Sequence, residues 1–462
     1  MAREIRLNAF VMNCAGHQSP GLWAHPRDRS AHYTDIDYWT GLARKLEAGL
    51  FDGVFLADVL GVYDVFGGTP DAALRAGIQV PVNDPLMVIP AMAAVTRDIG
   101  FGVTSLTSYE PPYLFARRMS TLDHLTKGRI AWNIVTGYLD SAAKGMGQDV
   151  QMTHEDRYAQ AEEYLEVVYA LWEGSWEDGA VLHDRERRIF TDPAKVHRVR
   201  HDGKHYKVDA IHLCEPSPQR TPVLYQAGQS GVGKAFAARH AECVFTASHS
   251  WRNVKGHVSD IRTQAAANGR NPADISIFTL LTLIPGRTED EARAKYEDYR
   301  QYVSTEGSLA LVSGWTGIDL SAFDPDEPIT STTNNAIVSV AEALTRAGHG
   351  DVWTVRRIAG WAGVGGLAPV VCGTPAQIAD ELERWVADTD VDGFNLAYAL
   401  SPETFEDIVD LVVPELQRRG RYKTAYAPGV LREKLQGPGR RLTAPDHPAA
   451  RFRPAGRAEA AQ

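Results

Sequence analysis

The chain alternates between short apolar runs and longer amphipathic segments. Runs of apolar and β-branched residues predict strands at 5–13, 51–58, 99–106, 128–136, 221–228, 242–248, 275–286 and 393–400. Apolar residues at helical spacing predict helices at 35–50, 84–96, 111–126, 154–174, 231–240, 251–268, 288–303, 374–388 and 402–420. Pro90 is expected to kink or shorten the second of these helices. About eight strand–helix alternations indicate an α/β fold, a (β/α)8 TIM barrel.

Three long stretches interrupt the alternation, at about 59–83, 175–220 and 304–373. In such barrels the loops that follow the strands form the active-site face, so we expect these insertions to act as lids or dimer contacts. The sequence therefore predicts a single barrel domain over residues 1–420. The segment 421–462 is rich in Pro, Arg and Ala, and we expect a C-terminal extension that wraps the surface or a partner subunit.

The composition is that of an ordinary globular protein. The 462 residues are 44% hydrophobic and 23% charged, which provides enough apolar material for a large core. The net charge of −10 argues against a nucleic-acid surface, because such a surface needs a basic face. We expect no nucleic-acid partner.

Signals for export, membranes and metals are weak in this sequence. The four cysteines lie far apart with no C-x-x-C pair, so we expect neither a zinc site nor a disulfide framework. The segment MAREIRLNAFVMN lacks the apolar core of a signal peptide, and no apolar run is long enough to span a bilayer. No cluster of His, Asp and Glu indicates a bound metal. We expect a cytoplasmic protein that binds neither a membrane nor a metal ion.

The segment YQAGQSGVGKAF at 225–236 contains G-x-x-x-x-G-K, the frame of an ATP-binding phosphate loop. The next residue is Ala235, where such a loop has Ser or Thr to reach magnesium, so ATP hydrolysis is the weakest interpretation. Two others stay open. The N–H groups of a glycine-rich turn at a helix N-terminus favour any phosphate or anion. A glycine turn that only joins a strand to a helix explains the segment equally well.

Polar residues at the carboxyl ends of barrel strands point into the catalytic mouth. Here these residues are Asn13, Cys14, His17, Asp58, Thr104, Thr107, Asn133, Thr136 and the segment 226–230. Asp58 ends an otherwise apolar strand and is a strong candidate, because an unpaired buried carboxylate is costly. A threonine at a strand end often only bonds to the backbone, and Cys14 also suits a small buried apolar position. His17 lies in a loop, where a site role and a chance surface position are equally supported.

His154 and Tyr158 in HEDRY lie four residues apart, on one face at the start of a predicted helix. Together with the positive end of the helix dipole they are suited to bind a phosphate. The alternative is a helix cap with a packed tyrosine. Two helix starts that suit a phosphate, with few acid–base candidates nearby, indicate that a cofactor carries the chemistry.

Longer motifs identify a family. They are NAFVMNCAGHQSPGLW, FDGVFLADVLGVYDVF, QVPVNDPLM, MSTLDHLTKGRIAWNIVTGYLDSAAKGMG, HEDRYAQAEEYLEVVYALWEGSWED, CEPSPQRTPVLYQAGQSGVGKAFAARHAE and VDGFNLAYALSPETFEDIVDLVVPEL. Through them, from about residue 5 to 450, the chain resembles the flavin-dependent monooxygenases of the bacterial-luciferase-like superfamily. The similarity is to the branch of nitrilotriacetate, dibenzothiophene-sulfone, long-chain-alkane and dimethyl-sulfide monooxygenases.

The resemblance implies an FMN site. In this family the Q-A-G-x-S turn and the H-x-x-R-Y helix start hold the FMN phosphate, so the ATP-loop frame in YQAGQSGVGKAF is coincidental. The resemblance assigns flavin contacts to Asp58, Thr104, Asn133, His154, Tyr158, Ala227, Gly228 and Ser230. The candidate catalytic residues are Thr104 and Asn133, at the position of dioxygen, and His17, Tyr63 and Tyr138, on the substrate side.

The implied enzyme is a two-component monooxygenase. A separate flavin reductase makes reduced FMN from NAD(P)H, and this chain uses reduced FMN as a co-substrate. With dioxygen it then oxygenates a small apolar substrate in a dry pocket. The sequence contains no G-x-G-x-x-G fingerprint for a nicotinamide, which agrees with this division of labour. We expect a homodimer or a homotetramer.

The substrate prediction depends on a few local segments. VNDPLM, GGLAPV and VDGFNLAYALSP are most similar to the dimethyl-sulfide and alkane members, and Tyr138 favours the dimethyl-sulfide group. A thioether such as dimethyl sulfide is the expected substrate, with a long-chain alkane, a sulfone or an aminopolycarboxylate as the alternatives. Two other classes also remain open: a deazaflavin-dependent oxidoreductase on the same fold, and a flavin-storing or light-emission-associated protein.

Overall fold

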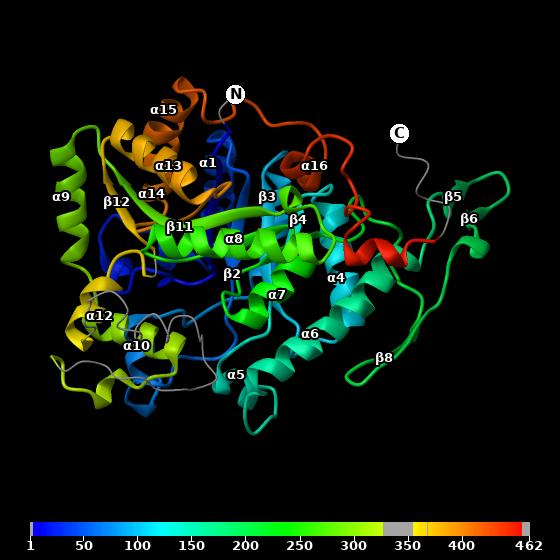
Figure 1. Cartoon of the computed structure of the whole chain (residues 1–462), viewed down its shortest axis with the longest axis horizontal. Coiled ribbons are helices and arrows are strands. Elements are labelled where there is room, and N and C mark those ends of the chain that lie inside the picture. The colour runs from blue at the N-terminus through cyan, green and yellow to red at the C-terminus, as the bar shows by residue number, and fades with distance from the viewer. Residues whose placement is uncertain (1–2, 327–353, 367, 455–462) are drawn as a thin grey trace.

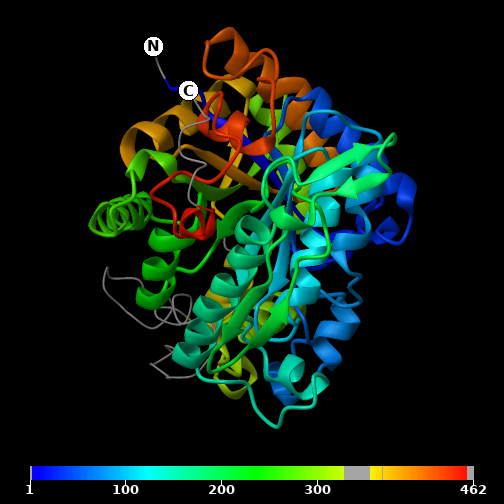
Figure 2. The ribbon, with the colours of Figure 1, turned by 90° about the vertical axis from the view of Figure 1, so that its right-hand side faces the viewer.

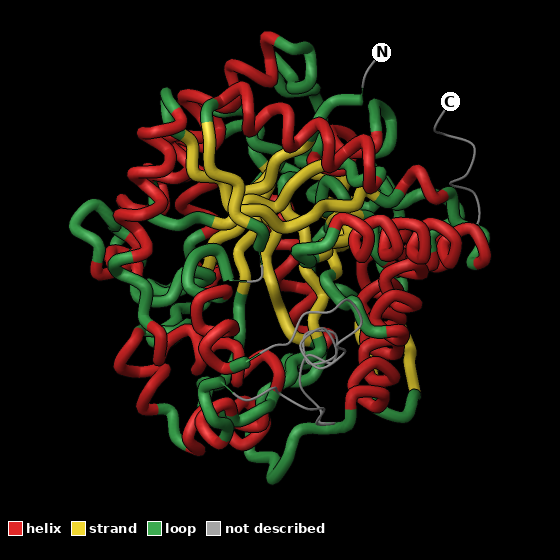
Figure 3. Tube along the Cα trace, turned by 60° about the vertical axis from the view of Figure 1, so that its left-hand side comes forward, coloured by secondary structure: helices red, strands yellow, loops and turns green. Residues whose placement is uncertain are grey.

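Eight parallel strands close into a barrel (Figure 3). The computed structural model describes residues 3–326, 354–366 and 368–454. The barrel strands are β1 (Arg6–Met12), β2 (Gly53–Ala57), β3 (Gly100–Leu106), β4 (Ile130–Val135), β9 (Val223–Gln226), β10 (Cys243–Thr246), β11 (Ser276–Pro285) and β13 (Gly393–Ala397). Neighbouring strands pair in parallel, and the pairing of β10 with β11 closes the ring. The predicted TIM barrel is therefore confirmed.

Helices cover the outside of the barrel (Figures 1 and 2). They are α1 (Ile36–Ala48), α3 (Ile89–Ala94), α4 (Pro112–Leu125), α6 (His154–Tyr169), α7 (Gly231–His240), α8 (Trp251–Ala267), α9 (Glu289–Arg300), α13 (Pro375–Thr389), α14 (Glu403–Asp407) and α15 (Val413–Arg418). A π-helical turn over Ile408–Val412 joins the last two. Side-chain caps begin several helices, as Asp35 does for α1 and Thr374 for α13.

The helix predicted at 84–96 forms two pieces. A 3-10 turn covers Pro85–Met87 and α3 begins at Ile89. Pro90 therefore lies in the first turn, where its missing N–H leaves no hydrogen bond unmade. The proline shortens the helix at its start and does not kink its middle.

The core has two layers. Between the strands and the outer helices lies the largest cluster of buried side chains, which includes Trp39, Phe101 and Trp132. Inside the barrel a smaller aromatic cluster contains Phe55 and Phe245, whose ring centroids lie 4.6 Å apart. These rings fill the barrel interior below the mouth.

Short elements in the first and third interruptions, together with a short helix that follows β4, gather beyond the carboxyl ends of the strands, in the lower part of Figure 1. They are α2 (Asp71–Ala76), α5 (Asp140–Gly145), α10 (Thr305–Thr316) and α12 (Val355–Trp361). Helix α10 packs against both α2 and α12. A ninth strand, β12 (Val370–Gly373), pairs with the end of β11 and was not predicted. Part of the third interruption, at 327–353 and 367, lies outside the described residues.

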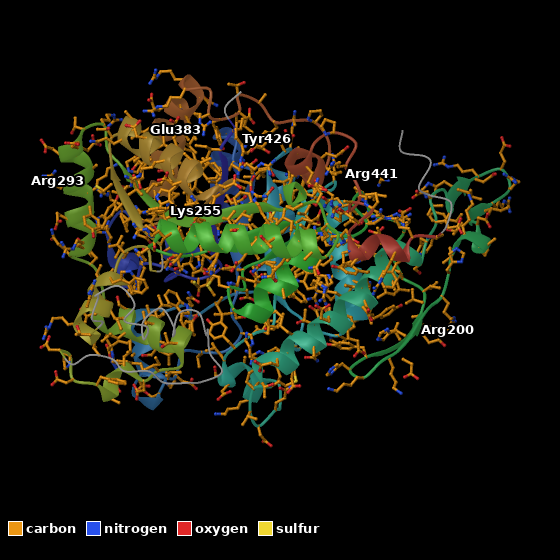
Figure 4. All side chains as sticks on the ribbon, viewed as in Figure 1. Arg200, Lys255, Arg293, Glu383, Tyr426 and Arg441 are labelled. Atoms are coloured by element: carbon orange, nitrogen blue, oxygen red, sulfur yellow. The ribbon has the colours of Figure 1, made fainter. Side chains whose placement is uncertain are left out.

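The interruption at 175–220 contains two antiparallel hairpins. One pairs β5 (Val181–Asp184) with β6 (Ile189–Thr191), and the other pairs β7 (Val199–Asp202) with β8 (Lys207–Ala210). Both lie to one side of the barrel in Figure 1. Arg200, labelled in Figure 4, lies on β7 at the outer side of the molecule.

The C-terminal segment closes the amino-terminal end of the barrel. Its helix α16 (Leu431–Gln436) places Leu431 and Leu435 in the aromatic cluster inside the barrel. Tyr426, labelled in Figure 4, donates a hydrogen bond of 2.8 Å to the Phe51 carbonyl oxygen. This part of the chain thus packs on its own barrel. Over the described residues, no helix is long and apolar enough to cross a membrane.

Candidate functional site

A cavity of about 320 Å³ opens at the carboxyl ends of the barrel strands. Every barrel strand contributes a side chain to its lining: Phe10, Phe55, Thr104, Asn133, Gln226, Phe245, Leu280 and Asn395. Loops and helices beyond the strands add Asp58, Tyr138, His154, Tyr158, Ala227, Gly228, Ser230 and Trp315. The volume falls in the range of small-molecule sites. The cavity is therefore the candidate site.

Two helix N-termini meet at one end of this cavity. Ser230 caps α7, since its Oγ accepts a hydrogen bond of 3.1 Å from the Gly233 N–H. His154 is the first residue of α6, and its Nε2 lies 3.3 Å from the same Oγ. Arg157, one turn further along α6, also lines the cavity. Helix N-termini carry partial positive charge and free N–H groups, so this end suits a phosphate or another anion.

The glycine turn before α7 and the first turn of α7 lie tightly against α6. A Cβ atom on Gly228 would come within 2.6 Å of the Tyr158 hydroxyl, and one on Gly233 within 2.8 Å. The Gly228 N–H is fixed by a hydrogen bond of 2.7 Å to Gln226 Oε1. A side chain at either position would have to displace the Tyr158 hydroxyl, so glycine permits the close approach of the two helix starts.

Lys234, the lysine of the ATP-loop frame, points elsewhere. Its Nζ lies 2.6 Å from Asp260 Oδ2 on α8. Lys234 is absent from the lining of the cavity. A lysine that reaches the phosphates is part of the ATP-loop mechanism, so this geometry gives the ATP interpretation no support.

At the middle of the cavity a pair of polar side chains lies on adjacent strands. Asn133 Nδ2 donates to Thr104 Oγ1 at 2.9 Å. Within the described part of the chain, Asn133 Oδ1 is buried without a hydrogen-bond partner, as is Asn395 Oδ1 across the barrel. A buried acceptor without a donor is costly. These two oxygens therefore suit the N–H groups of a bound ligand.

Asp58 follows β2 at the edge of the cavity. Burial, with a contribution from the charge of Asp84, raises the pKa of its carboxyl group to about 7. The folded protein therefore keeps the Asp58 proton up to near-neutral pH, whereas the unfolded chain releases it near its ordinary value. Folding stability is thus lost as the pH rises through this window.

Asp58→Asn is expected to raise the free energy of unfolding at pH 8 by about 1–2 kcal/mol. This value is smaller than the pKa shift alone would give, because water in the cavity screens the charge. At pH 4 we expect almost no difference, because the folded parent is then also uncharged at this position. Chemical denaturation at a series of pH values measures the difference. Asp84→Asn removes the neighbouring charge, so the pH range over which Asp58 lowers the stability should become narrower. If the difference between Asp58→Asn and the parent does not depend on pH, the raised pKa of Asp58 is not its cause.

The substrate-side candidates lie at two depths. Tyr138 lines the cavity, together with Trp315 of α10. Tyr63 and His17 lie behind the lining, and both are about 2% exposed. The His17 ring packs edge-on against Phe10, with ring centroids 4.5 Å apart, and burial lowers its pKa to about 3. His17 is therefore a neutral packed side chain in this geometry, one layer away from the cavity.

Several lining residues were not singled out from the sequence, among them Gln18, Arg157, Trp315 and Asn395. Arg157 lies between His154 and Tyr158 in HEDRY, so the motif itself carried the signal. Asn395 interrupts an apolar strand, between Phe394 and Leu396, which was a usable signal for an inward polar residue. Trp315 comes from an insertion and has no such signal.

Comparison with known proteins agrees with this geometry. The family model described as luciferase-like monooxygenase matches residues 10–393. The dimethyl-sulfide monooxygenase of Hyphomicrobium sulfonivorans is 52% identical over 98% of this chain and 95% of its own length. The long-chain alkane monooxygenase of Geobacillus thermodenitrificans is 50% identical over 98% of this chain and 99% of its own length.

Solved structures show the same similarity. The crystal structure of DmoA from Hyphomicrobium sulfonivorans superposes with a TM-score of 0.92, covering 98% of this chain and 96% of that one. A riboflavin lyase crystallised with modified FMN and riboflavin is 34% identical, with a TM-score of 0.92 over 98% of this chain and 100% of that one. The chain belongs to the luciferase-like monooxygenase family.

Proposed function

We propose that the protein is the oxygenase of a two-component system that binds reduced FMN and uses dioxygen to oxygenate a small apolar substrate. The observation that carries the proposal is the layout of the cavity. One end has two helix N-termini and Arg157, the middle has amide oxygens without a hydrogen-bond partner among the described residues, and the far wall is mainly apolar. A phosphate, a polar ring system and an apolar substrate suit these three parts in that order.

The chain's own residues fit FMN in chemical type. Ser230, His154 and Arg157 would hold the phosphate, with the N–H groups at the start of α7. Asn133 and Asn395 offer acceptors for ring N–H groups, and reduction of the ring adds such donors. This complementarity favours the reduced form. The riboflavin lyase relative, solved with modified FMN, supports a flavin on this fold.

Reduced FMN, when bound, supplies the electrons with which dioxygen is activated. The residues of the chain do the rest. Thr104 and Asn133 hold each other in a fixed orientation at the barrel centre. Tyr138 and Trp315 form the wall against which the substrate lies, and the apolar cluster behind them excludes water. Asp58 retains a proton near neutral pH at the cavity edge.

We further propose a thioether such as dimethyl sulfide as the substrate. The relative that is 52% identical acts on dimethyl sulfide and the one that is 50% identical acts on long-chain alkanes, so a long-chain alkane is the alternative. Tyr138, which lines the cavity, agrees with the resemblance to the dimethyl-sulfide group, and on that ground we favour the sulfur compound. A separate NAD(P)H:flavin reductase and a homodimeric or homotetrameric assembly complete the proposal.

An anaerobic titration of the purified protein with reduced FMN, oxidised FMN and ATP tests the proposal. We expect reduced FMN to bind at least about tenfold more tightly than oxidised FMN, the worth of roughly one hydrogen bond of differential contact. ATP should not bind. No preference for reduced FMN would remove the oxygenase proposal and would favour a flavin-storing protein or a deazaflavin-dependent enzyme.

A further inference from the structure

A chain of hydrogen bonds runs from the cavity wall into the protein behind Tyr138. The hydroxyl oxygens of Tyr138 and Tyr63 lie 2.6 Å apart. The Tyr63 hydroxyl lies 2.9 Å from Gln79 Oε1, and Gln79 Nε2 lies 3.0 Å from the carbonyl oxygen of His17. Tyr138 lines the cavity, whereas Tyr63 and Gln79 are buried.

The backbone carbonyl at the inner end determines the direction of every proton in this chain. The His17 carbonyl can only accept, so the amide nitrogen of Gln79 faces it and the amide oxygen faces Tyr63. Tyr63 therefore donates to Gln79. Because a hydroxyl has a single proton, Tyr138 must then donate to Tyr63. The opposite direction would leave the buried Gln79 oxygen without a partner.

The hydroxyl of Tyr63 is fully occupied. It donates to Gln79, accepts from Tyr138, and also interacts with the side chain of Trp315, whose indole can only donate. Burial raises the pKa of both phenols, so both protons are present at neutral pH. The direction of the chain therefore does not change over the physiological range.

The backbone around Gln79 is held rigidly. Its φ is +50°, in the left-handed region that residues other than glycine rarely adopt. The Gln79 N–H donates to the Gly16 carbonyl oxygen at 2.9 Å. A Cβ on Gly16 would lie 2.2 Å from the Gly77 carbonyl oxygen, so the two segments cross in direct backbone contact. An unusual backbone conformation that the surroundings enforce is typical of functional sites.

We infer that Tyr138 is a specificity-determining residue whose hydroxyl faces the cavity as a hydrogen-bond acceptor only, with Gln79 and Tyr63 as positioning residues. Sulfones, sulfoxides and ketones carry acceptors and no donors, so their oxygen would meet a lone pair at this wall. Thioethers and alkanes place apolar atoms there, and an alcohol gains a hydrogen bond. The inference rests on the proposed function, which makes this wall the substrate side. It favours thioethers and alkanes as substrates and disfavours sulfones.

Binding of ligand pairs with matched shape tests this inference without turnover. Propan-2-ol and acetone differ mainly in offering or lacking a donor, and their dissociation constants can be measured by ligand-observed NMR. We expect the protein to bind propan-2-ol about two- to tenfold more tightly than acetone, the range of one neutral hydrogen bond. Dimethyl sulfoxide should bind as weakly as acetone.

Three variants show whether the ligand preference comes from the orientation of the Tyr138 hydroxyl proton or from the shape of the pocket. Tyr63→Phe and Gln79→Leu each free the Tyr138 proton to turn toward the cavity, so the preference should reverse toward acetone. Tyr138→Phe removes the hydroxyl, and the two ligands should then bind equally. Thermal unfolding of each variant checks that it is folded. If the other two variants fail to fold, Tyr138→Phe alone still tests the inference, because it leaves Tyr63 and Gln79 in place.

Equal binding of the two ligands by the parent protein, or binding of neither, would overturn the inference. So would a preference that Tyr63→Phe and Tyr138→Phe leave unchanged. The ratios are measured with and without added FMN. Failure of the flavin proposal would appear in the flavin titration alone, whereas failure of this inference would appear in the ligand ratios alone.

Discussion

Arg432→Ala is expected to lower the free energy of unfolding by about 3–5 kcal/mol, the cost of leaving a buried charge without its partner. Arg432 lies on α16 and has no exposed side-chain surface, and Glu242 is 3% exposed. The guanidinium donates to both Glu242 carboxylate oxygens, at 2.6 and 3.1 Å. It also donates at 2.8 Å to the carbonyl oxygen of Thr221. Burial alone would raise the pKa of Glu242, and the adjacent Arg432 holds it below its ordinary value.

Comparison of Arg432→Ala with a double variant distinguishes the loss of the ion pair from a simple loss of packing. Arg432→Met with Glu242→Gln removes both charges and keeps most of the volume, so it should recover a large part of the lost stability. Denaturant unfolding at pH 7 measures both proteins. If Arg432→Ala is within about 1 kcal/mol of the parent, or if the double variant is no more stable than Arg432→Ala, the buried ion pair is not the source of the lost stability.

The barrel could be predicted because its strands and helices repeat a simple local pattern. Strands such as 99–106 and helices such as 231–240 follow directly from apolar runs and helical spacing, and both are found at those places. The ninth strand could not be predicted. Val370–Gly373 is short, lies at the end of a long interruption, and, among the described residues, pairs only with the far end of β11. Long-range pairing decides its structure, and no local pattern does.

The candidate site was predictable where strand ends carry polar residues. Asp58, Thr104 and Asn133 line the cavity, since every barrel strand delivers its inward side chains to one mouth. The second layer was not predictable. His17 and Tyr63 follow the strand ends in sequence but are buried behind the lining. Their neighbours come from distant parts of the chain, since Gly16 lies against Gly77 and Tyr63 lies against Gly314 of α10.

The contribution of the insertions to the cavity could not be predicted for a related reason. Trp315 reaches the cavity from α10, and its place depends on the packing of α10 against α2 and α12. The periodicity of a helix gives its buried face and not the element that covers it. The contribution of the insertion to the wall could therefore be found only in three dimensions.

Ser230→Ala is expected to weaken the binding of reduced FMN by about 1.5–3 kcal/mol, which is roughly 10- to 150-fold in the dissociation constant. The Ser230 hydroxyl lies between the first turn of α7 and His154, and a charge-assisted hydrogen bond to the phosphate is the contact that alanine removes. The same change also removes the cap of α7 and should cost about 1 kcal/mol of stability. Anaerobic fluorescence titration measures the affinity, and thermal unfolding measures the cap.

Riboflavin separates the two effects, because it lacks the phosphate and keeps the ring. The affinity for reduced riboflavin should be almost unchanged in Ser230→Ala, since the proposed ring contacts, Asn133 and Asn395, lie on strands away from Ser230. Ser230→Asp is the sharper variant: aspartate caps a helix as well as serine does, but its charge repels a phosphate. It should therefore keep the stability of the parent, bind riboflavin normally and lose most of its affinity for FMN. An equal loss for both flavins would show that Ser230 only shapes the turn, and the anion would then have to bind elsewhere in the cavity.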